Sequence, residues 1–391
     1  MNDTTIGTRR LHISVSPMVK KALAGFKISR AVRAGDWLLT NGQMDMGDGG
    51  KVLNPDDLMA QTVTCMRSVY EVFAKADCSL AELAQLQIFY LAGSVDDEAA
   101  YRQRILDEFP ECSDVLMIMT PVPSFATVGS EVEIDAIGVK GTRAVANDAA
   151  GVVKAVRRGD WVFASDRVTA GVGGLVAGLQ STLSELGCGL PDICRLYVYY
   201  PEDLSREECV RTERELAHVF ADAPPAFHAT LLPADAMRTS SVELEVIAHR
   251  NGEQQKRGYG RIEPGTIGLD WPFARALCCA EVIFASGQFP LDEAGAIAHR
   301  GKIADQARTV MARLEDALHE AGASMADLAK IKTYYVGAWD KDNWFDNLRA
   351  RMERLSDPGP ASSGIEGLPP VREGALLSVD GIAVLDGTTG A

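Results

Sequence analysis

The stretch Gln61–Tyr90, QTVTCMRSVYEVFAKADCSLAELAQLQIFY, recurs twice more in this chain, starting at Gly171 and at Gln306. Its apolar residues are spaced three and then four positions apart, which places them on one face of a helix. Its last residues are aromatic or β-branched, which favours a strand. The equivalent apolar trios are Met66, Val69, Phe73; Val176, Leu179, Leu183; and Met311, Leu314, Leu318. The sequence therefore contains one helix-then-strand unit three times.

The segments around each copy repeat as well, and they give the domain boundaries. A hairpin pattern precedes the first two copies, with the turns Gly35-Asp36-Trp37 and Gly159-Asp160-Trp161,. The second copy lacks the Gly-rich turn that precedes the helix of the first. We predict an α+β chain with an N-terminal extension (1–27), a first unit (28–145), a shortened second unit (146–250), a polar, Gly-rich linker (251–271) and a third unit (272–391).

The composition narrows the functional classes. The 391 residues carry a formal charge of −15, and binding to a phosphate backbone needs clustered lysine and arginine instead,. The eight cysteines form no CxxC pair, so neither a zinc site nor a disulfide framework is indicated,. No apolar run reaches about 20 residues, and the start MNDTTIGTRR has no signal-peptide core,. We expect a cytoplasmic protein without metal or cofactor, and without nucleic-acid or membrane partners.

Several short motifs carry a family resemblance. They are the Ser286-Gly287-Gln288 turn after the hairpin, the Gln-led helix, the link from Gly322-Ala323-Ser324 to Asp327-Leu328, and the last strand, Val132–Ile137 in the first unit, which alternates acidic and apolar residues. In this order, each unit resembles the Rid (YjgF-like) family. Members of that family are homotrimers with sheets inside, helices outside and ligand clefts between subunits. The resemblance implies a single-chain pseudo-trimer, with the sheets packed into a central pseudo-threefold barrel and three unequal clefts. Further self-association stays open.

The resemblance also implies a chemistry and shows where this chain departs from it. Family deaminases hydrolyse reactive enamines and imines. In them an arginine after Pro-Ala binds the substrate carboxylate, and the first acid of the last strand orients water. The arginine is replaced by Met117, Phe227 and Ser362 in the three units. The acid is kept as Glu133 and Glu243, whereas Ser378 replaces it in the third unit.

Three residues are candidate catalytic groups. Glu133 and Glu243 could exchange protons near neutrality if they face an apolar cleft, although each could equally be a hydrogen-bonded sheet acid. His228 lies beside the position of the missing arginine and could act as a general base, whereas a lone histidine is more often structural.

The candidate substrate-binding residues come from turns and loops. The turn residues Asn41 and Gln43, and their equivalents Ser286 and Gln288, could position a substrate carbonyl or water, or could only cap a strand,. Arg238 and Arg372 could bind the substrate anion in place of the missing arginine. Asp166-Arg167 could select substrate or form a local ion pair, and the stretch from Ser362 to Glu366 resembles one in chorismatases, which have a Rid-like fold. The full set is Asn41, Gln43, Asp166, Arg167, Arg238, Ser286, Gln288, Ser362, Ser363, Glu366 and Arg372.

Together these features predict an enzyme that hydrolyses a small polar metabolite, with an imine, enamine or amide-type C–N bond, by glutamate-assisted attack of water at one cleft between units. One alternative is a chorismatase-like hydrolase. The other is a protein that binds a small metabolite without turning it over, and the loss of the family arginine favours it.

Overall fold

The first unit of the fold runs from a short edge strand to a long closing strand. The computed structural model describes residues 10–15, 25–47, 50–168, 171–233, 242–261, 272–337, 341–367 and 370–385. The elements of the first unit are β1 (Arg10–Ser14), β2 (Ser29–Ala34), β3 (Trp37–Thr40), β4 (Gln43–Met44), α2 (Leu58–Lys75), β5 (Leu83–Leu91), α3 (Glu98–Glu108), β6 (Leu116–Val122) and β7 (Val132–Val139).

The second and third units follow the same order of hairpin, helix, strand, helix, strand and strand. The second contains β8 (Arg143–Asn147), β9 (Val153–Arg158), β10 (Trp161–Val168), α4 (Gly171–Glu185), β11 (Ile193–Pro201), α5 (Arg206–Val219), β12 (Ala226–Leu232) and β13 (Val242–His249). The third contains α6 (Gly252–Gln255), β14 (Arg257–Tyr259), β15 (Ala276–Cys279), β16 (Val282–Gln288), α7 (Ile303–Glu320), β17 (Leu328–Val336), α8 (Lys341–Met352), β18 (Ala361–Gly367) and β19 (Leu377–Val384). The units therefore begin earlier in the chain than the ranges 28–145, 146–250 and 272–391. β1 pairs with β2, β8 pairs with β9, and β14, in the segment expected to be a linker, pairs with β15.

Local sequence explains where the first long helix forms and which face it buries. Asp57 caps α2, since its side chain accepts a hydrogen bond from the backbone N–H of Ala60,. The stripe Met66, Val69 and Phe73 is buried against the sheet. The corresponding stripes of α4 and α7 are buried as well, except that Val176 is only partly buried.

In each unit the last strand lies at the centre of the sheet. β5 pairs in parallel with β6 and antiparallel with β7, and the same arrangement holds for β11, β12 and β13 and for β17, β18 and β19. Pairing of Ala361 with Ser29 joins the sheets of the third and first units into one sheet, while the second unit has a separate sheet. A bridge between Ala226 and Ala274 links the second and third units.

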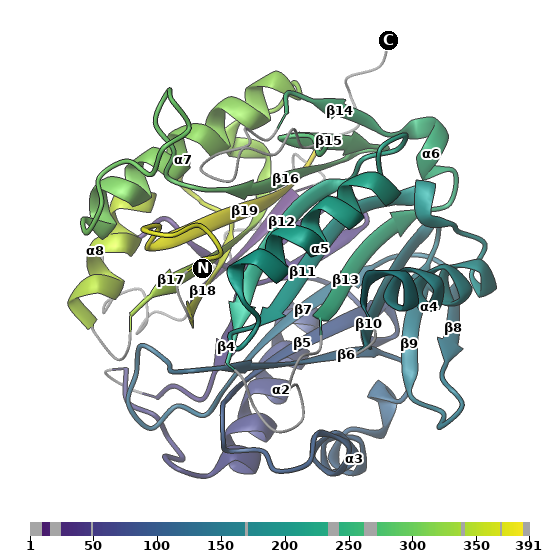
Figure 1. Ribbon diagram of the computed structural model, residues 1–391. Coiled ribbons are helices and arrows are strands. Elements are labelled where there is room, and N and C mark those ends of the chain that lie inside the picture. The colour runs from purple at the N-terminus through teal and green to yellow at the C-terminus, as the bar shows by residue number, and fades with distance from the viewer. Residues whose placement is uncertain are drawn as a thin grey trace.

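Helices lie at the periphery of the molecule, and strands fill its interior (Figure 1). One apolar core lies between the sheet and helices of each unit. A further core takes side chains from all three units and includes Trp37, Trp161 and Phe284, whose rings pack edge to face,. The chain therefore has a mixed α+β fold in which the inner faces of the sheets bury one another. Among the helices that the structure describes, none is long and apolar enough to cross a membrane.

Candidate functional site at the unit boundaries

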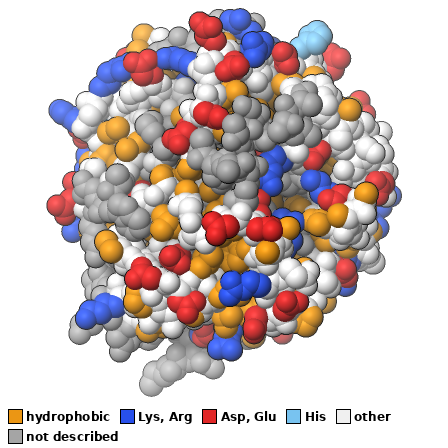
Figure 2. Space-filling model, turned by 60° about the horizontal axis from the view of Figure 1, so that its bottom comes forward, with side chains coloured by type: hydrophobic (Ala, Val, Ile, Leu, Met, Phe, Trp, Pro, Cys, Tyr) orange, Lys and Arg blue, Asp and Glu red, His pale blue; other side chains and the backbone are white. Residues whose placement is uncertain are grey.

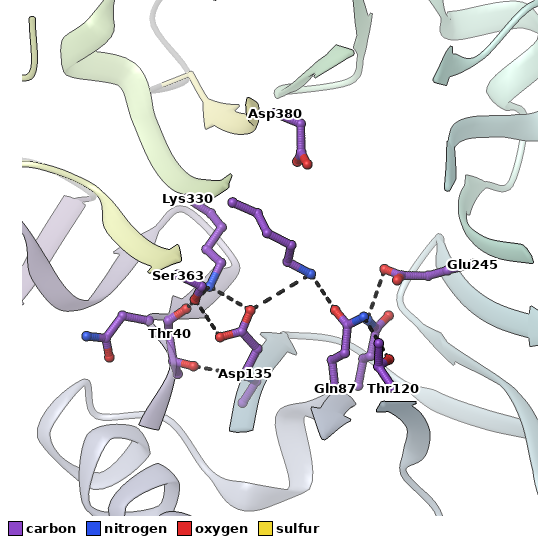
Figure 3. Close-up of polar contacts among 12 residues, drawn as sticks. Thr40, Gln87, Thr120, Asp135, Glu245, Lys330, Ser363 and Asp380 are labelled. Atoms are coloured by element: carbon purple, nitrogen blue, oxygen red, sulfur yellow. Dashed lines mark hydrogen bonds and ion pairs between the residues drawn. The ribbon is translucent and has the colours of Figure 1, made fainter. Parts of the chain in front are cut away.

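Equivalent polar residues meet where the inner faces of the three units come together. A residue on the long strand of one unit binds the second acidic residue of the closing strand of the next. Lys330 Nζ lies 2.9 Å from Asp135 Oδ2, Arg195 Nη2 lies 2.9 Å from Asp380 Oδ1, and Gln85 Nε2 donates to Glu245 Oε1 at 3.1 Å. Figure 3 shows the three acids directed toward a common centre. This pattern defines a first–second, a second–third and a third–first boundary.

Buried cations and anions are paired across these boundaries. Burial lowers the pKa of Lys330, although Asp135 beside it opposes that shift. Burial alone would raise the pKa of Asp380, but Arg195 and His228 hold it well below its ordinary value. Lys332 donates to Gln87 Oε1 and lies 3.8 Å from Asp135 Oδ2. Unpaired charges are costly in such surroundings, so these contacts fix how the units meet.

Lys330 is held by three groups at the third–first boundary. Its Nζ donates to the backbone oxygen of Thr40 at 2.6 Å, to Asp135 and to the hydroxyl of Ser363 (Figure 3). Ser363 in turn donates to Asp135 Oδ1 at 2.6 Å. All three N–H bonds of the ammonium group are therefore used. The predicted residue Ser363 contributes to this arrangement.

Glu133 lies two residues before Asp135 on β7 and points to the same side of the sheet,. Its side chain packs on Gly42, where an added Cβ would lie 1.5 Å from Glu133 Oε1. Burial, followed by the charge of Asp135, raises its pKa from 4.5 to about 8, although Lys330 and Lys332 oppose the shift. Among the described residues, none donates a hydrogen bond to this carboxyl group. Glu133 is thus a buried acid that is largely protonated at neutral pH, and its carboxyl group can still form hydrogen bonds with a ligand or water.

The turn residues near Glu133 make contacts within their own unit. The amide nitrogen of Gln43 donates to Asn41, and its oxygen accepts from Arg30 Nε at 3.0 Å and from Ser68 Oγ at 2.9 Å. The predicted role of Gln43 in substrate binding therefore competes with a structural one, because its amide group already links the turn to α2.

His228 connects two side chains at the second–third boundary. Its Nδ1 lies 2.8 Å from Asp380 Oδ2, and its Nε2 lies 2.9 Å from Ser378 Oγ. The hydroxyl of Tyr197 donates to Asp380 Oδ2 at 2.7 Å and also contacts His228 Nδ1. Burial lowers the pKa of His228, although Asp380 opposes the shift, so the imidazole is neutral at pH 7.

A small cavity of about 10 Å³ lies near this histidine, and its lining residues Gly287 and Phe289 pack beside the imidazole ring. Arg372 is buried in its wall, 3.5 Å from Glu213 Oε2 and above the ring of Phe289. Burial raises the pKa of Glu213 to about 7, although Arg372 opposes the shift. Of the predicted residues, Arg372 and Gln288 therefore reach one cavity. The lining residues are Arg275, Gly287, Gln288, Phe289, Leu291, Arg313 and Arg372.

Ser286 is used by the backbone next to this cavity. It accepts from the backbone N–H of Phe227 at 2.8 Å and donates to the backbone oxygen of Ala274 at 2.6 Å. Its hydroxyl thus joins the second and third units rather than pointing to a ligand.

The first–second boundary has an apolar residue at one position that is polar at the other two. Ile118 stands where the other boundaries have His228 and Ser363. Glu243 is buried there and accepts a long hydrogen bond of 3.5 Å from Ser165.

Asp166 and Arg167 do not pair with each other through their side chains. The carboxylate of Asp166 lies 3.1 Å from Lys154 Nζ, and Arg167 reaches into the first unit to Glu98 at 2.8 Å. The only contact between the two residues that the described part of the chain shows is from the backbone N–H of Arg167 to Asp166 Oδ1.

The remaining predicted residues lie elsewhere. Ser362 and Glu366 alternate with Ser363 along β18 and therefore face the opposite side of the sheet,. Ser362 accepts from Arg351 of α8 at 3.4 Å, and Glu366 packs on Gly337. Arg238 lies outside the described residues.

An open groove of about 560 Å³ lies on the outside of the molecule, between α2 and α3. Its walls include Asp57, Arg67, Arg104, Asp107 and Glu108. This mixture of charges is typical of a solvated helix surface, and none of the boundary residues described above lines the groove.

The inward-facing residues of the long strands are not among the residues predicted from the sequence. Lys330 and Lys332 occupy alternate positions of a strand in which every residue before Val336 is buried. Two such cations in a predicted buried strand are a usable signal, because buried lysine is rare unless it is paired.

Comparisons with known proteins agree with this architecture. The family model described as endoribonuclease L-PSP matches residues 267–384. A RutC family protein of Pyrococcus abyssi is 38% identical over 96 residues, which cover 24% of this chain and 72% of that protein. The mitochondrial protein mmf1 of Schizosaccharomyces pombe is 29% identical over 115 residues, which cover 29% of this chain and 68% of mmf1.

A solved structure extends the similarity in fold to most of the chain. The crystal structure of a chorismatase superimposes with a TM-score of 0.56 over 78% of this chain and 93% of that chain, at 14% sequence identity. At this identity the match concerns the fold alone, which is a mixed α+β fold of the Rid and chorismatase type. From the match to the Pyrococcus protein over most of its length, we conclude that this chain belongs to the Rid (YjgF-like) family, which includes the RutC family proteins.

Proposed function

We propose that the chain is a hydrolase of a small polar metabolite, that it cleaves an imine, enamine or amide-type C–N bond, and that Glu133 is its acid–base group. The observation that carries this proposal is the buried Glu133 carboxyl group, which has a pKa of about 8 and receives no hydrogen bond from the described residues. A group with a pKa near the working pH is the most effective proton-transfer catalyst.

The proposed reaction uses the ionised fraction of Glu133. Its carboxylate removes a proton from water as the water oxygen attacks the carbon of the C–N bond. For an amide, the carboxyl group then protonates the nitrogen as the C–N bond breaks. For an imine, or an enamine after proton transfer to its carbon, the carboxyl group first protonates the nitrogen to give a carbinolamine; the carboxylate then takes the hydroxyl proton and passes it to the nitrogen as the C–N bond breaks and the carbonyl forms. Lys330 and Lys332 place positive charge near this step, where negative charge develops on the substrate,. Asp135 and Ser363 support the reaction indirectly because they hold Lys330 in place.

We further propose that the three units form a pseudo-trimer around a central pseudo-threefold barrel, in the cytoplasm. Support comes from the equivalent contacts of Lys330, Arg195 and Gln85 and from the core that all three units share. The free state of the described cysteines suits a reducing compartment,.

This assembly has a simple test. A monomer of this length that folds as one body should have a radius of gyration of about 21 Å in X-ray scattering. A monomer with a radius well above 30 Å would show separate domains and would contradict the arrangement.

A direct test of substrate class is 2-aminoacrylate, an enamine that carries a carboxylate. We expect at least about tenfold less deamination than for a family member with the Pro-Ala-Arg arginine, because a charge-assisted contact is worth roughly 1.5–3 kcal/mol. Met117, Phe227 and Ser362 occupy that position here. Release of ammonia and pyruvate can be followed in a coupled assay. Equal rates would contradict this prediction and would show that another arginine binds the substrate carboxylate.

A role in metabolite binding without turnover is the second candidate. It is favoured by the missing arginine. Chorismate hydrolysis is the other alternative, supported by the shared fold. Cleavage of RNA is disfavoured by the net charge of −15 and by the mixed acidic and basic side chains on the face shown in Figure 2,.

A further inference from the structure

A serine replaces the family acid at the second–third boundary. Ser378 of β19 stands where the other units have Glu133 and Glu243, and it contacts His228, which contacts Asp380. We propose that Ser378 is the nucleophile of a second site, which cleaves small esters or thioesters whose acyl group carries a carboxylate. This activity goes beyond the proposed function, since it does not use Glu133.

The contacts of His228 fix the tautomer that such a nucleophile needs. Nδ1 lies 2.8 Å from a carboxylate oxygen of Asp380, so Nδ1 carries the proton and donates it to that oxygen. Nε2 is then left to accept the hydroxyl proton of Ser378 at 2.9 Å. An acid, a histidine and a serine in this order are the arrangement of a nucleophilic triad. The arrangement arises because β19 carries Ser378 and Asp380 on the same side, two residues apart.

Neighbouring residues hold the histidine in this orientation. Arg195 Nη2 binds Asp380 Oδ1 at 2.9 Å, which leaves Asp380 Oδ2 to His228 and Tyr197. A Cβ at Gly287 would lie 2.3 Å from His228 Cδ2, so this glycine lets the turn pack directly on the imidazole ring. A base that a third group orients in this way is typical of an activated nucleophile.

The adjoining cavity indicates the kind of substrate. Phe289 lines the cavity and lies beside the triad: the centre of its ring is 6.1 Å from the centre of the His228 ring and 5.4 Å from Arg372 Cζ. Arg275, Arg313 and Arg372 line the cavity, and a guanidinium group is well suited to a carboxylate,. Ser378 is fully buried, and the cavity has room for about one water-sized group,. The acyl group must therefore be short.

The proposed reaction is an acyl transfer in two steps. Ser378 Oγ attacks the carbonyl carbon while its proton moves to His228 Nε2. The bond to the alcohol or thiol breaks, and His228 returns the proton to that leaving group. Water then attacks the acyl carbon, His228 accepts a proton from the water, and the proton passes to Ser378 Oγ as the carboxylic acid leaves.

The test uses methanesulfonyl fluoride, a small reagent that sulfonylates nucleophilic serines, on the folded full-length chain. Intact-mass measurement should show one methanesulfonyl group per chain, and peptide fragmentation should place it on Ser378. Ser378→Ala should abolish the modification. Ser29→Ala is the matched control and should keep it. Ser29 is also buried and 3.0 Å from a histidine, His12, but among the described residues neither of the two contacts an acid.

The position of the methanesulfonyl group in the wild-type chain tests the proposal even if Ser378→Ala fails to fold. No adduct, or an adduct on any residue other than Ser378, would overturn the proposal.

Discussion

Glu133→Gln is expected to lower the turnover of the true substrate by about 10²–10⁴-fold, the range that a placed acid–base group contributes. Glutamine keeps the size of the side chain but cannot exchange the proton. The pKa of about 8 for Glu133 suits its side chain to proton transfer near neutral pH. Ammonia release from a panel of imines and primary amides identifies the substrate. The kcat for that substrate is then compared between the wild-type protein and Glu133→Gln.

Glu243→Gln is the matched control for this prediction. Glu243 occupies the equivalent position of the second unit, but it faces a boundary with Ile118 in place of a polar residue and accepts from Ser165. We expect this variant to keep nearly the full rate and an unchanged melting temperature. Full activity of Glu133→Gln would show that Glu133 is not the acid–base group. Loss of activity only in Glu243→Gln would show that the active site lies at the first–second boundary.

Lys330→Met is expected to destabilise the fold by roughly 3–5 kcal/mol, because it removes the nearest cation from the buried carboxylate of Asp135 and leaves it, among the described residues, only Ser363 and the more distant Lys332,. Both side chains of this pair are less than a tenth exposed. Urea unfolding at neutral pH measures the loss. The double variant Lys330→Met with Asp135→Leu should be more stable than Lys330→Met alone, since it removes the uncompensated charge as well.

An exposed ion pair provides the comparison. Arg308 of α7 contacts Glu353 at 2.9 Å on the surface, and Arg308→Ala should leave the unfolding midpoint unchanged,. A Lys330→Met protein as stable as the wild type would mean that the contacts across the boundary do not hold the units together.

The fold could be predicted from sequence wherever local periodicity decides it. The trio Met66, Val69 and Phe73 predicted the buried face of α2, and the alternation around Glu133 and Asp135 predicted that both acids lie on one side of β7. These features depend on residues close in sequence, for which helical and strand periods are reliable guides.

The contacts between units could not be predicted in the same way. The repeat shows that Lys330, Arg195 and Gln85 are equivalent, but not that each meets an acid of the next unit. Such contacts join residues far apart in sequence and depend on how whole sheets pack. For the same reason the sequence suggested ligand contacts for Gln43 and Ser286, whose polar groups bind neighbouring turns, helices and backbone.

The central claim is that Glu133 is a buried acid whose pKa has moved into the neutral range, and its carboxyl carbon reports this directly. The chain is labelled with glutamate carrying ¹³C at the side-chain carboxyl, and Glu133→Gln assigns the signal by its loss. We expect the chemical shift of this signal to titrate with a midpoint of about 8. A midpoint near 4.5, the ordinary value for glutamate, would contradict it.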